Sequence, residues 1–203
     1  MSKRILIGLS VIAAVAAIVV GATTAYFSDV ETSSGNTFTA GTMDLKLNNG
    51  DTNVIMFTVE NVKPGDQGSA EVNLKNAGDL DGFLDITFSN IVDNDPSLTE
   101  PEEQDGDNTQ GVGKGELADN LHILAYIDED NDDTYDANNG DTLVYDGLAV
   151  NINEKGLSDH SFSSGEAKPF RIEWSVGTDV GNEIQNDVAG FDITFELAQT
   201  AGQ

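Results

Sequence analysis

The chain has 203 residues, with 9 Lys and Arg against 36 Asp and Glu and no cysteine, and its formal net charge is −27. Nucleic-acid binding rests on Lys and Arg that neutralise phosphates, so this charge excludes a nucleic-acid partner. The lack of cysteine removes disulfides, thiolate zinc sites and thiol catalysis, which leaves oxygen atoms as the main metal ligands. Apolar residues make up 38% of the chain, which is enough for one folded domain of this length.

The first 25 residues have the layout of a secretory signal. A short basic start precedes an apolar run over residues 5–20, and Thr23 and Ala25 fit the small-x-small pattern of signal peptidases. We therefore expect a signal helix over residues 1–25 that is cut between Ala25 and Tyr26, or one residue later. The alternative is a retained anchor, as in a type IV pilin, although the run is shorter than the roughly 20 residues that span a bilayer.

The rest of the chain has the pattern of short strands. Apolar and polar side chains alternate over residues 70–75, 170–176 and 191–198, which places one face of each extended segment in a core. Shorter apolar runs bounded by Gly, Asn and Asp predict further strands at residues 43–47, 54–59, 83–91, 121–127, 142–145 and 148–152. Helix is expected only in short pieces near residues 115–120 and 181–188. We therefore predict an all-β, jelly-roll-like sandwich of two sheets over residues 41–203.

Residues 93–115 interrupt the series of predicted strands. They are rich in Asp, Glu, Gly and Asn and nearly free of apolar side chains. This composition predicts a long, solvated acidic insertion between two strands.

Residues 128–141 form the most acidic stretch and have the spacing of a calcium loop. Counted from Asp128, oxygen ligands fall at positions 1, 3, 5, 7 and 9, and a later carboxylate follows. The candidate ligands are Asp128, Asp130, Asp132, the Thr134 carbonyl, Asp136 and Asp141. Asp133 and Asn139 stand where an EF-hand has Gly and Glu. A solvated acidic turn is the alternative, but the mutual repulsion of the aspartates favours an ion, and calcium is the expected cofactor.

Few residues are candidates for catalysis. His122 and His160 are the only histidines, and no His-Glu-x-x-His pair exists that would hold a catalytic zinc. His122 lies in a predicted strand, whereas His160 lies among polar residues and is expected to be exposed. No Gly-x-Ser-x-Gly elbow occurs, and a Ser-His-Asp arrangement stays open because Ser and Asp are plentiful. We expect no enzymatic activity.

The sequence around the cleavage site is distinctive. It reads Thr-Ala-Tyr-Phe-Ser-Asp at 24–29 and Asn-Thr-Phe-Thr-Ala-Gly-Thr-Met-Asp-Leu at 36–45. This junction resembles the start of the TasA/camelysin family of exported matrix-fibre proteins, and weaker matches follow at residues 62–66, 75–78, 170–174, 182–187 and 191–195. The resemblance implies a jelly-roll fold, a dedicated signal peptidase and a location in the extracellular matrix or at the cell surface.

In the fibres of the family that the chain resembles, the segment released by signal cleavage is donated as a strand to the next subunit. Residues 26–40 carry bulky apolar side chains suited to that role: Tyr26, Phe27, Val30 and Phe38. Because donor and acceptor surfaces differ, strand addition would propagate head to tail as a homopolymer, with accessory matrix subunits as further partners. The alternative is that residues 26–40 form the first strand of their own sheet.

We therefore expect a secreted structural protein that polymerises into matrix or surface fibres. A secreted metallopeptidase of the camelysin type and a monomeric calcium-dependent binding module are the alternatives. Cleavage would raise the negative charge to −29, since residues 1–25 hold two basic residues and no acidic one. Salt or divalent cations should then strengthen assembly by screening the repulsion between subunits.

Overall fold

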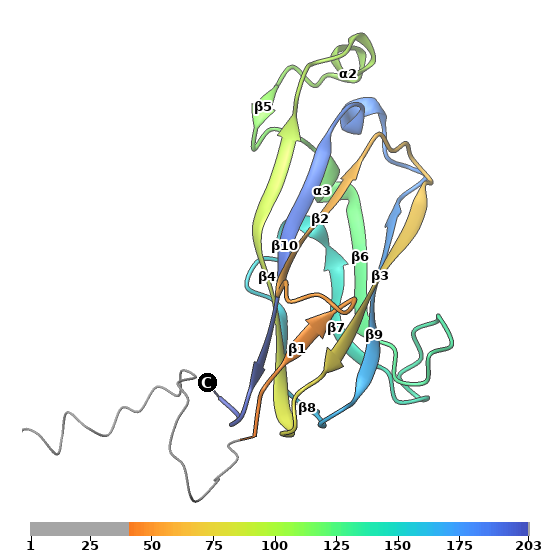
Figure 1. Ribbon diagram of the computed structural model, residues 1–203. Helices are drawn as coiled ribbons and strands as arrows, with labels where there is room; N and C mark the ends of the chain where they lie inside the picture. The colour runs from red at the N-terminus through yellow and green to blue at the C-terminus, as the bar shows by residue number, and fades with distance from the viewer. Residues whose placement is uncertain (1–40, 203) are drawn as a thin grey trace, which may run out of the picture. The chain divides into compact units, whose positions relative to one another are not determined.

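The computed structural model describes residues 41–202, in which ten strands form two antiparallel sheets that face each other as a sandwich (Figure 1). The first sheet has the order β1 (Leu45–Leu47), β3 (Gln67–Asn76), β9 (Ala167–Val176), β6 (Leu121–Ile127) and β7 (Thr142–Leu148). The second has the order β2 (Val54–Glu60), β10 (Val188–Ala198), β4 (Gly82–Asp95) and β5 (Gly111–Val112), and β8 (Gly156–Phe162) pairs with the start of β4. The predicted all-β sandwich is confirmed.

The core lies between the sheets and follows from the alternation of apolar residues. In β10, Phe191, Ile193 and Phe195 are fully buried, while the residues between them are half-buried. Phe170 of β9 meets Phe195 of β10 edge to face, with ring centroids 5.2 Å apart. Side chains from opposite sheets thus pack directly against one another.

Most predicted elements are present, and the differences have local causes. The short helical pieces appear as α3 (Leu117–Asn120) and the 3-10 turn η2 (Asn182–Ile184). The strand predicted at residues 148–152 is wrong: β7 ends at Leu148, and η1 (Ala149–Asn151) follows as a 3-10 helix. Ala149 and Ile152 are both buried, and the Ile152 N–H donates to the Ala149 carbonyl at 3.1 Å. A three-residue spacing of apolar side chains suits that turn, not a strand.

Residues 93–115 contain more structure than their composition predicts. After β4, the helix α2 (Glu100–Asp105) begins with a capping box between Thr99 and Glu102 and ends at Gly106 in the left-handed region, with φ of 98°. The expectation of a solvated insertion is wrong for Asp95 and Glu102, which are fully buried. In Figure 1, α2, β5, α3 and η2 gather at one end of the sandwich, away from the start of β1.

Several predictions concern residues that lie outside the described part of the chain. These are the signal segment 1–25, the cleavage site at Ala25 and Tyr26, and the donor segment 26–40 with Phe27, Val30 and Phe38. Between residues 41 and 202, no helix is long and apolar enough to cross a membrane.

Candidate functional site

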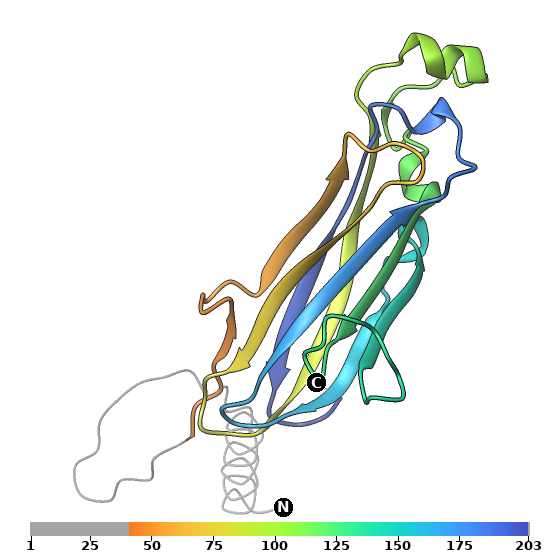
Figure 2. The same cartoon turned by 90° about the vertical axis from the view of Figure 1, so that its right-hand side faces the viewer.

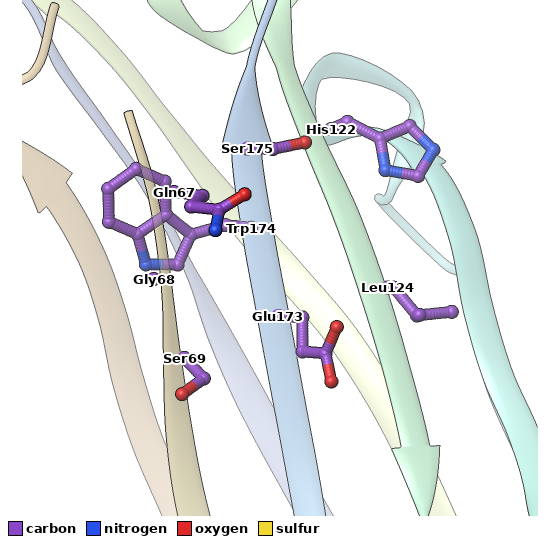
Figure 3. Close-up of a pocket in the computed structure, with 8 residues that line it drawn as sticks. All are labelled: Gln67, Gly68, Ser69, His122, Leu124, Glu173, Trp174 and Ser175. Atoms are coloured by element: carbon purple, nitrogen blue, oxygen red, sulfur yellow. The ribbon is translucent and has the colours of Figure 1, made fainter. Parts of the chain in front are cut away.

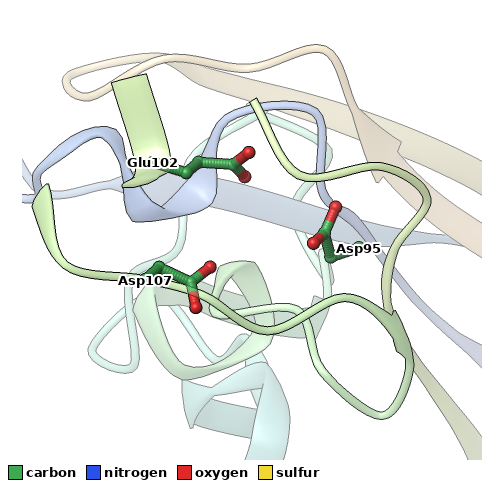
Figure 4. Close-up of side chains that lie close together, drawn as sticks. All are labelled: Asp95, Glu102 and Asp107. Atoms are coloured by element: carbon green, nitrogen blue, oxygen red, sulfur yellow. The ribbon is translucent and has the colours of Figure 1, made fainter. Parts of the chain in front are cut away.

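A cluster of carboxylates lies at the end of the sandwich where β4, α2, α3 and the segment before β10 meet. Each member has a buried oxygen with no hydrogen-bond partner among the described residues: Asp93, Asp95, Glu102, Asp107, Glu116 and Asp187. We call these six residues the acidic end cluster. One oxygen each of Asp95, Glu102 and Asp107 lies within 4.8 Å of the other two, and the three side chains point toward one another (Figure 4).

Backbone N–H groups hold four of these carboxylates by one oxygen and leave the other free; three are held in local turns, and Asp187 is held by the start of α3. Asp95 accepts the Ser97 N–H at 3.0 Å, and Asp107 accepts the Thr109 N–H and hydroxyl, each at 2.9 Å. Glu102 accepts the Thr99 N–H through the capping box. Asp187 accepts the N–H groups of Glu116 and Leu117 at 2.7 and 3.0 Å. The backbone thus orients each side chain but provides hydrogen bonds to only one of its two carboxylate oxygens.

The acidic end cluster carries unbalanced negative charge. No salt bridge found among residues 41–202 involves any of its six members. Burial, together with the carboxylates of Asp107 and Asp187, raises the pKa of Glu116 to about 7, and burial raises the pKa of Asp187 to about 6. Burial and the neighbouring Glu102 also raise the pKa of Asp95. By contrast, the Thr109 N–H holds the pKa of Asp107 below its usual range.

The predicted calcium loop brings only part of its candidate ligands together. One oxygen each of Asp128, Asp130 and Asp141 lies within 4.8 Å of the other two. Asp132 and Asp136 instead accept backbone N–H groups two residues further on, from Thr134 at 2.9 Å and Asn138 at 2.8 Å. Thr134, whose carbonyl is the remaining candidate, is an exposed residue.

Asp128 is fully buried and already has four donors. Its first oxygen accepts the N–H groups of Asn131 and Asp132 at 2.6 and 3.3 Å. Its second accepts the Asp133 N–H at 3.1 Å and the Arg171 Nε at 2.9 Å. Burial acts to raise the pKa of Asp128, but these donors hold it below its usual range. A carboxylate offers about four lone-pair sites, so this one has none to spare. Calcium in this loop stays a prediction.

The two histidines do not join either carboxylate cluster. His122 lies in β6, as predicted, and its Nε2 is 3.0 Å from Asp146. His160 lies in β8 with Nε2 3.3 Å from Glu129 and a side chain only 18% exposed, so the expectation that it is exposed is wrong. The polar residues next to His160 in the sequence predicted exposure, because the contact that buries it comes from Glu129, which is distant in the sequence.

A hollow on the outer face of the first sheet contains His122 (Figure 3). It is lined by residues of β3, β6 and β9, among them Ser69, Ser175 and Glu173. No hydrogen bond in the described chain joins His122 to a serine, and the Nε2 that a serine nucleophile would need faces Asp146 instead. The hollow therefore does not assemble the Ser-His-Asp arrangement.

One flank of the sandwich has a free strand edge on each sheet. In Figures 1 and 2, β2 and β3 lie side by side along this flank. Among the described residues, β2 pairs only with β10, and β3 pairs with β1 only from Leu74 to Asn76. Three apolar side chains at these edges pack against the core but stay only half-buried: Ile55, Phe57 and Val72. We call the unpaired side of β2 the open edge.

The hydrogen-bond register shows which backbone groups are free. The Phe195 N–H donates to the Asn53 carbonyl at 2.8 Å, and bonded pairs alternate along an antiparallel ladder. Residues 53, 55, 57 and 59 therefore bond to β10. The others direct their N–H and C=O groups to the open edge: Val54, Met56, Thr58 and Glu60. Val54 and Met56 are 42% and 69% exposed, so the first half of the open edge is also apolar.

The fold and these sites define an antiparallel β-sandwich with oxygen-only acidic clusters and an open edge. Over residues 1–203, the sequence matches the family described as camelysin metallo-endopeptidase, and the chain belongs to this family. This membership confirms the resemblance read from the junction after residue 25. No curated protein matches the chain.

The name of the family implies a metal, and the available ligands indicate which kind fits. Both groups of converging residues among 41–202 consist of Asp and Glu alone. Carboxylate oxygens suit Ca²⁺ or Mg²⁺, whereas catalytic zinc usually takes His or Cys among its ligands. The donor set therefore fits a hard divalent cation and does not fit a zinc peptidase site.

Proposed function

We propose that the protein is a secreted structural subunit that polymerises into extracellular matrix or cell-surface fibres by strand addition at the open edge of β2. The observation that carries the proposal is the open edge itself, with four residues whose backbone groups have no partner in the described chain. Unpaired edges of this length are usually protected, because they invite pairing with another chain. The exposed Val54 and Met56 add apolar contact area for an incoming strand.

The proposed occupant is residues 26–40 of a neighbouring copy. Phe38 would point into the seam beside Ile55 and Phe57, while Thr37 and Thr39 would face outward, since side chains alternate along a strand. Phe27 and Val30 would make further apolar contacts with the neighbouring subunit. Donor and acceptor are different surfaces, so the contact propagates as a filament and does not close as a dimer. A dedicated signal peptidase would then start assembly by releasing Tyr26, and accessory subunits would join the same fibre.

The family description gives a second candidate, a secreted metallopeptidase. The carboxylate-only clusters and the unassembled His122 support the structural role over this one. Incubation of the purified protein with an unfolded polypeptide, with and without chelator, tests it. Cleavage that disappears in chelator would favour the peptidase.

Electron microscopy of the chain that starts at Tyr26 tests the donor segment. Phe38→Asp should abolish filaments because a charge cannot enter the apolar seam, whereas Thr37→Asp adds the same charge on the outward face and should leave them. Equal filament yields from both variants would contradict donation by this segment. Filaments from a chain that starts at Gly41 would contradict it as well.

A further inference from the structure

We propose that the acidic end cluster binds a divalent cation, with Ca²⁺ as the ion that fits best, through the free oxygens of Asp95, Glu102 and Asp107. The inference is independent of the fibre proposal. It concerns a different site from the loop at residues 128–141, and its residues lie in a segment whose composition predicts only a solvated insertion.

The first argument is the orphaned oxygens. Asp95 and Glu102 are fully buried and Asp187 is 1% exposed, yet each has one oxygen without a donor among the described residues. Buried carboxylates are normally paired, because an unpaired buried charge is far less stable than a solvated one. Local turns fix one oxygen of Asp95 and one of Glu102, and these two side chains and Asp107 point toward one another (Figure 4). A cation at that point would satisfy all three together.

The second argument is geometric. The three oxygens of Asp95, Glu102 and Asp107 lie within 4.8 Å of one another. Ca²⁺ binds oxygens at about 2.3–2.6 Å, so two ligands of one ion lie at most about 5 Å apart. Calcium also accepts six to eight oxygens in flexible arrangements. Asp187, Glu116 and Asp93 each also have a buried oxygen without a hydrogen-bond partner among the described residues.

The loop at residues 128–141 provides an internal comparison. Its buried carboxylates, Asp128 and Asp141, accept backbone N–H groups with both oxygens, and Arg171 neutralises Asp128. The acidic end cluster has the opposite arrangement, with free oxygens and no salt bridge to a cationic side chain of the described residues. A bound cation would therefore neutralise more unpaired charge in the acidic end cluster than in the loop.

A cation here would join three separate parts of the chain. Asp95 ends β4, Glu102 and Asp107 belong to α2 and the turn after it, and Asp187 precedes β10. Binding should therefore hold the α2 segment against the end of the sandwich and raise the unfolding temperature, because the ion binds the folded state alone.

Calorimetric titration of the full chain with CaCl₂, after treatment with EDTA and dialysis, tests the site. We expect an ion bound at this site whose affinity falls at least tenfold in Asp95→Asn and in Glu102→Gln. Glu103→Gln removes the same charge from an exposed position of α2 and serves as the matched control that should bind normally. Absence of binding at millimolar Ca²⁺, or unchanged affinity in both cluster variants, would overturn the proposal.

Thermal unfolding separates loss of the site from loss of the fold. In EDTA, Asp95→Asn should unfold at or above the temperature of the parent chain, since it relieves repulsion. In CaCl₂ its unfolding temperature should be lower than that of the parent chain. A variant that is less stable by the same amount in both buffers would point to a merely structural role for Asp95 and would contradict the proposal.

Discussion

Asn76 shows how one buried amide fixes the end of β3. Its Nδ2 donates to the carbonyls of Leu80 and Phe162 at 2.8 and 3.2 Å, and its Oδ1 accepts the Gly78 N–H at 3.1 Å. The residue thus links the turn before β4 to the end of β8. The Lys-Asn-Ala-Gly sequence at 75–78 is one of the weaker family matches, and the structure gives it a physical role.

Asn76→Leu should destabilise the fold by about 2–3 kcal/mol, because it keeps the volume but leaves buried polar groups without partners. Asn73→Leu changes the same residue type on an exposed position of β3 and should have little effect. Urea unfolding of both variants measures the difference. Equal midpoints would show that the Asn76 amide does not hold the turn.

Arg171 is the second residue whose replacement has a clear consequence. It donates to the fully buried Asp128 at 2.9 Å, and it also contacts Asp133 and Glu71. Arg171→Met should cost about 3 kcal/mol, since it leaves a buried carboxylate without its counter-charge. Lys63→Met breaks an exposed pair with Asp66 and serves as the control, with an unfolding midpoint expected near that of the parent. A similar loss from both would contradict the account of Asp128.

The two acidic sites differ in how far sequence could predict them. The loop was found from the spacing of Asp128, Asp130 and Asp141, which are close in the chain and do converge. The acidic end cluster joins Asp95 to Asp187, and no local pattern connects residues so far apart. The Thr-x-x-Glu capping box at Thr99 and Glu102, with Pro101 in the first turn and Gly106 after the last, was the available signal that residues 93–115 contain a helix.

At the scale of elements, β10 is the central strand of the second sheet. Phe191 is fully buried between Phe57 and Phe88, with ring centroids at 5.1 and 5.5 Å. Phe191→Ala should destabilise the fold by about 3–5 kcal/mol through the lost contacts and the cavity. Phe57→Ala, on the half-exposed edge strand, should cost clearly less. Guanidinium unfolding compares them, and a larger loss at Phe57 would contradict the assignment of β2 as an open edge.

Elements with strict alternation were predictable, and others were not. β6 matches its predicted range, because a continuous apolar run with β-branched and aromatic residues favours a buried strand. β8 was missed because its sequence, Gly-Leu-Ser-Asp-His-Ser-Phe, buries only Phe162 completely. Its strand conformation comes from pairing with β4, which is a tertiary effect that local sequence does not encode.

At the scale of the molecule, the charge of −29 after cleavage should oppose assembly. The screening length falls from about 30 Å at 0.01 M salt to about 10 Å at 0.1 M. Filament growth of the chain that starts at Tyr26, followed by light scattering, should therefore speed up between these concentrations of NaCl. Both samples contain EDTA, so that cation binding by the acidic end cluster does not affect the comparison. Growth that is independent of salt would contradict a limiting role for repulsion between subunits.

The most direct test of strand addition is electron microscopy of two variants at Thr58, whose N–H points to the open edge. Thr58→Pro removes that N–H without breaking a bond to β10, and edge strands tolerate such a proline. Thr58→Val keeps the N–H. Both sandwiches should remain folded by circular dichroism, with filaments from Thr58→Val and none from Thr58→Pro. Filaments of equal yield from both variants would contradict assembly through the open edge of β2.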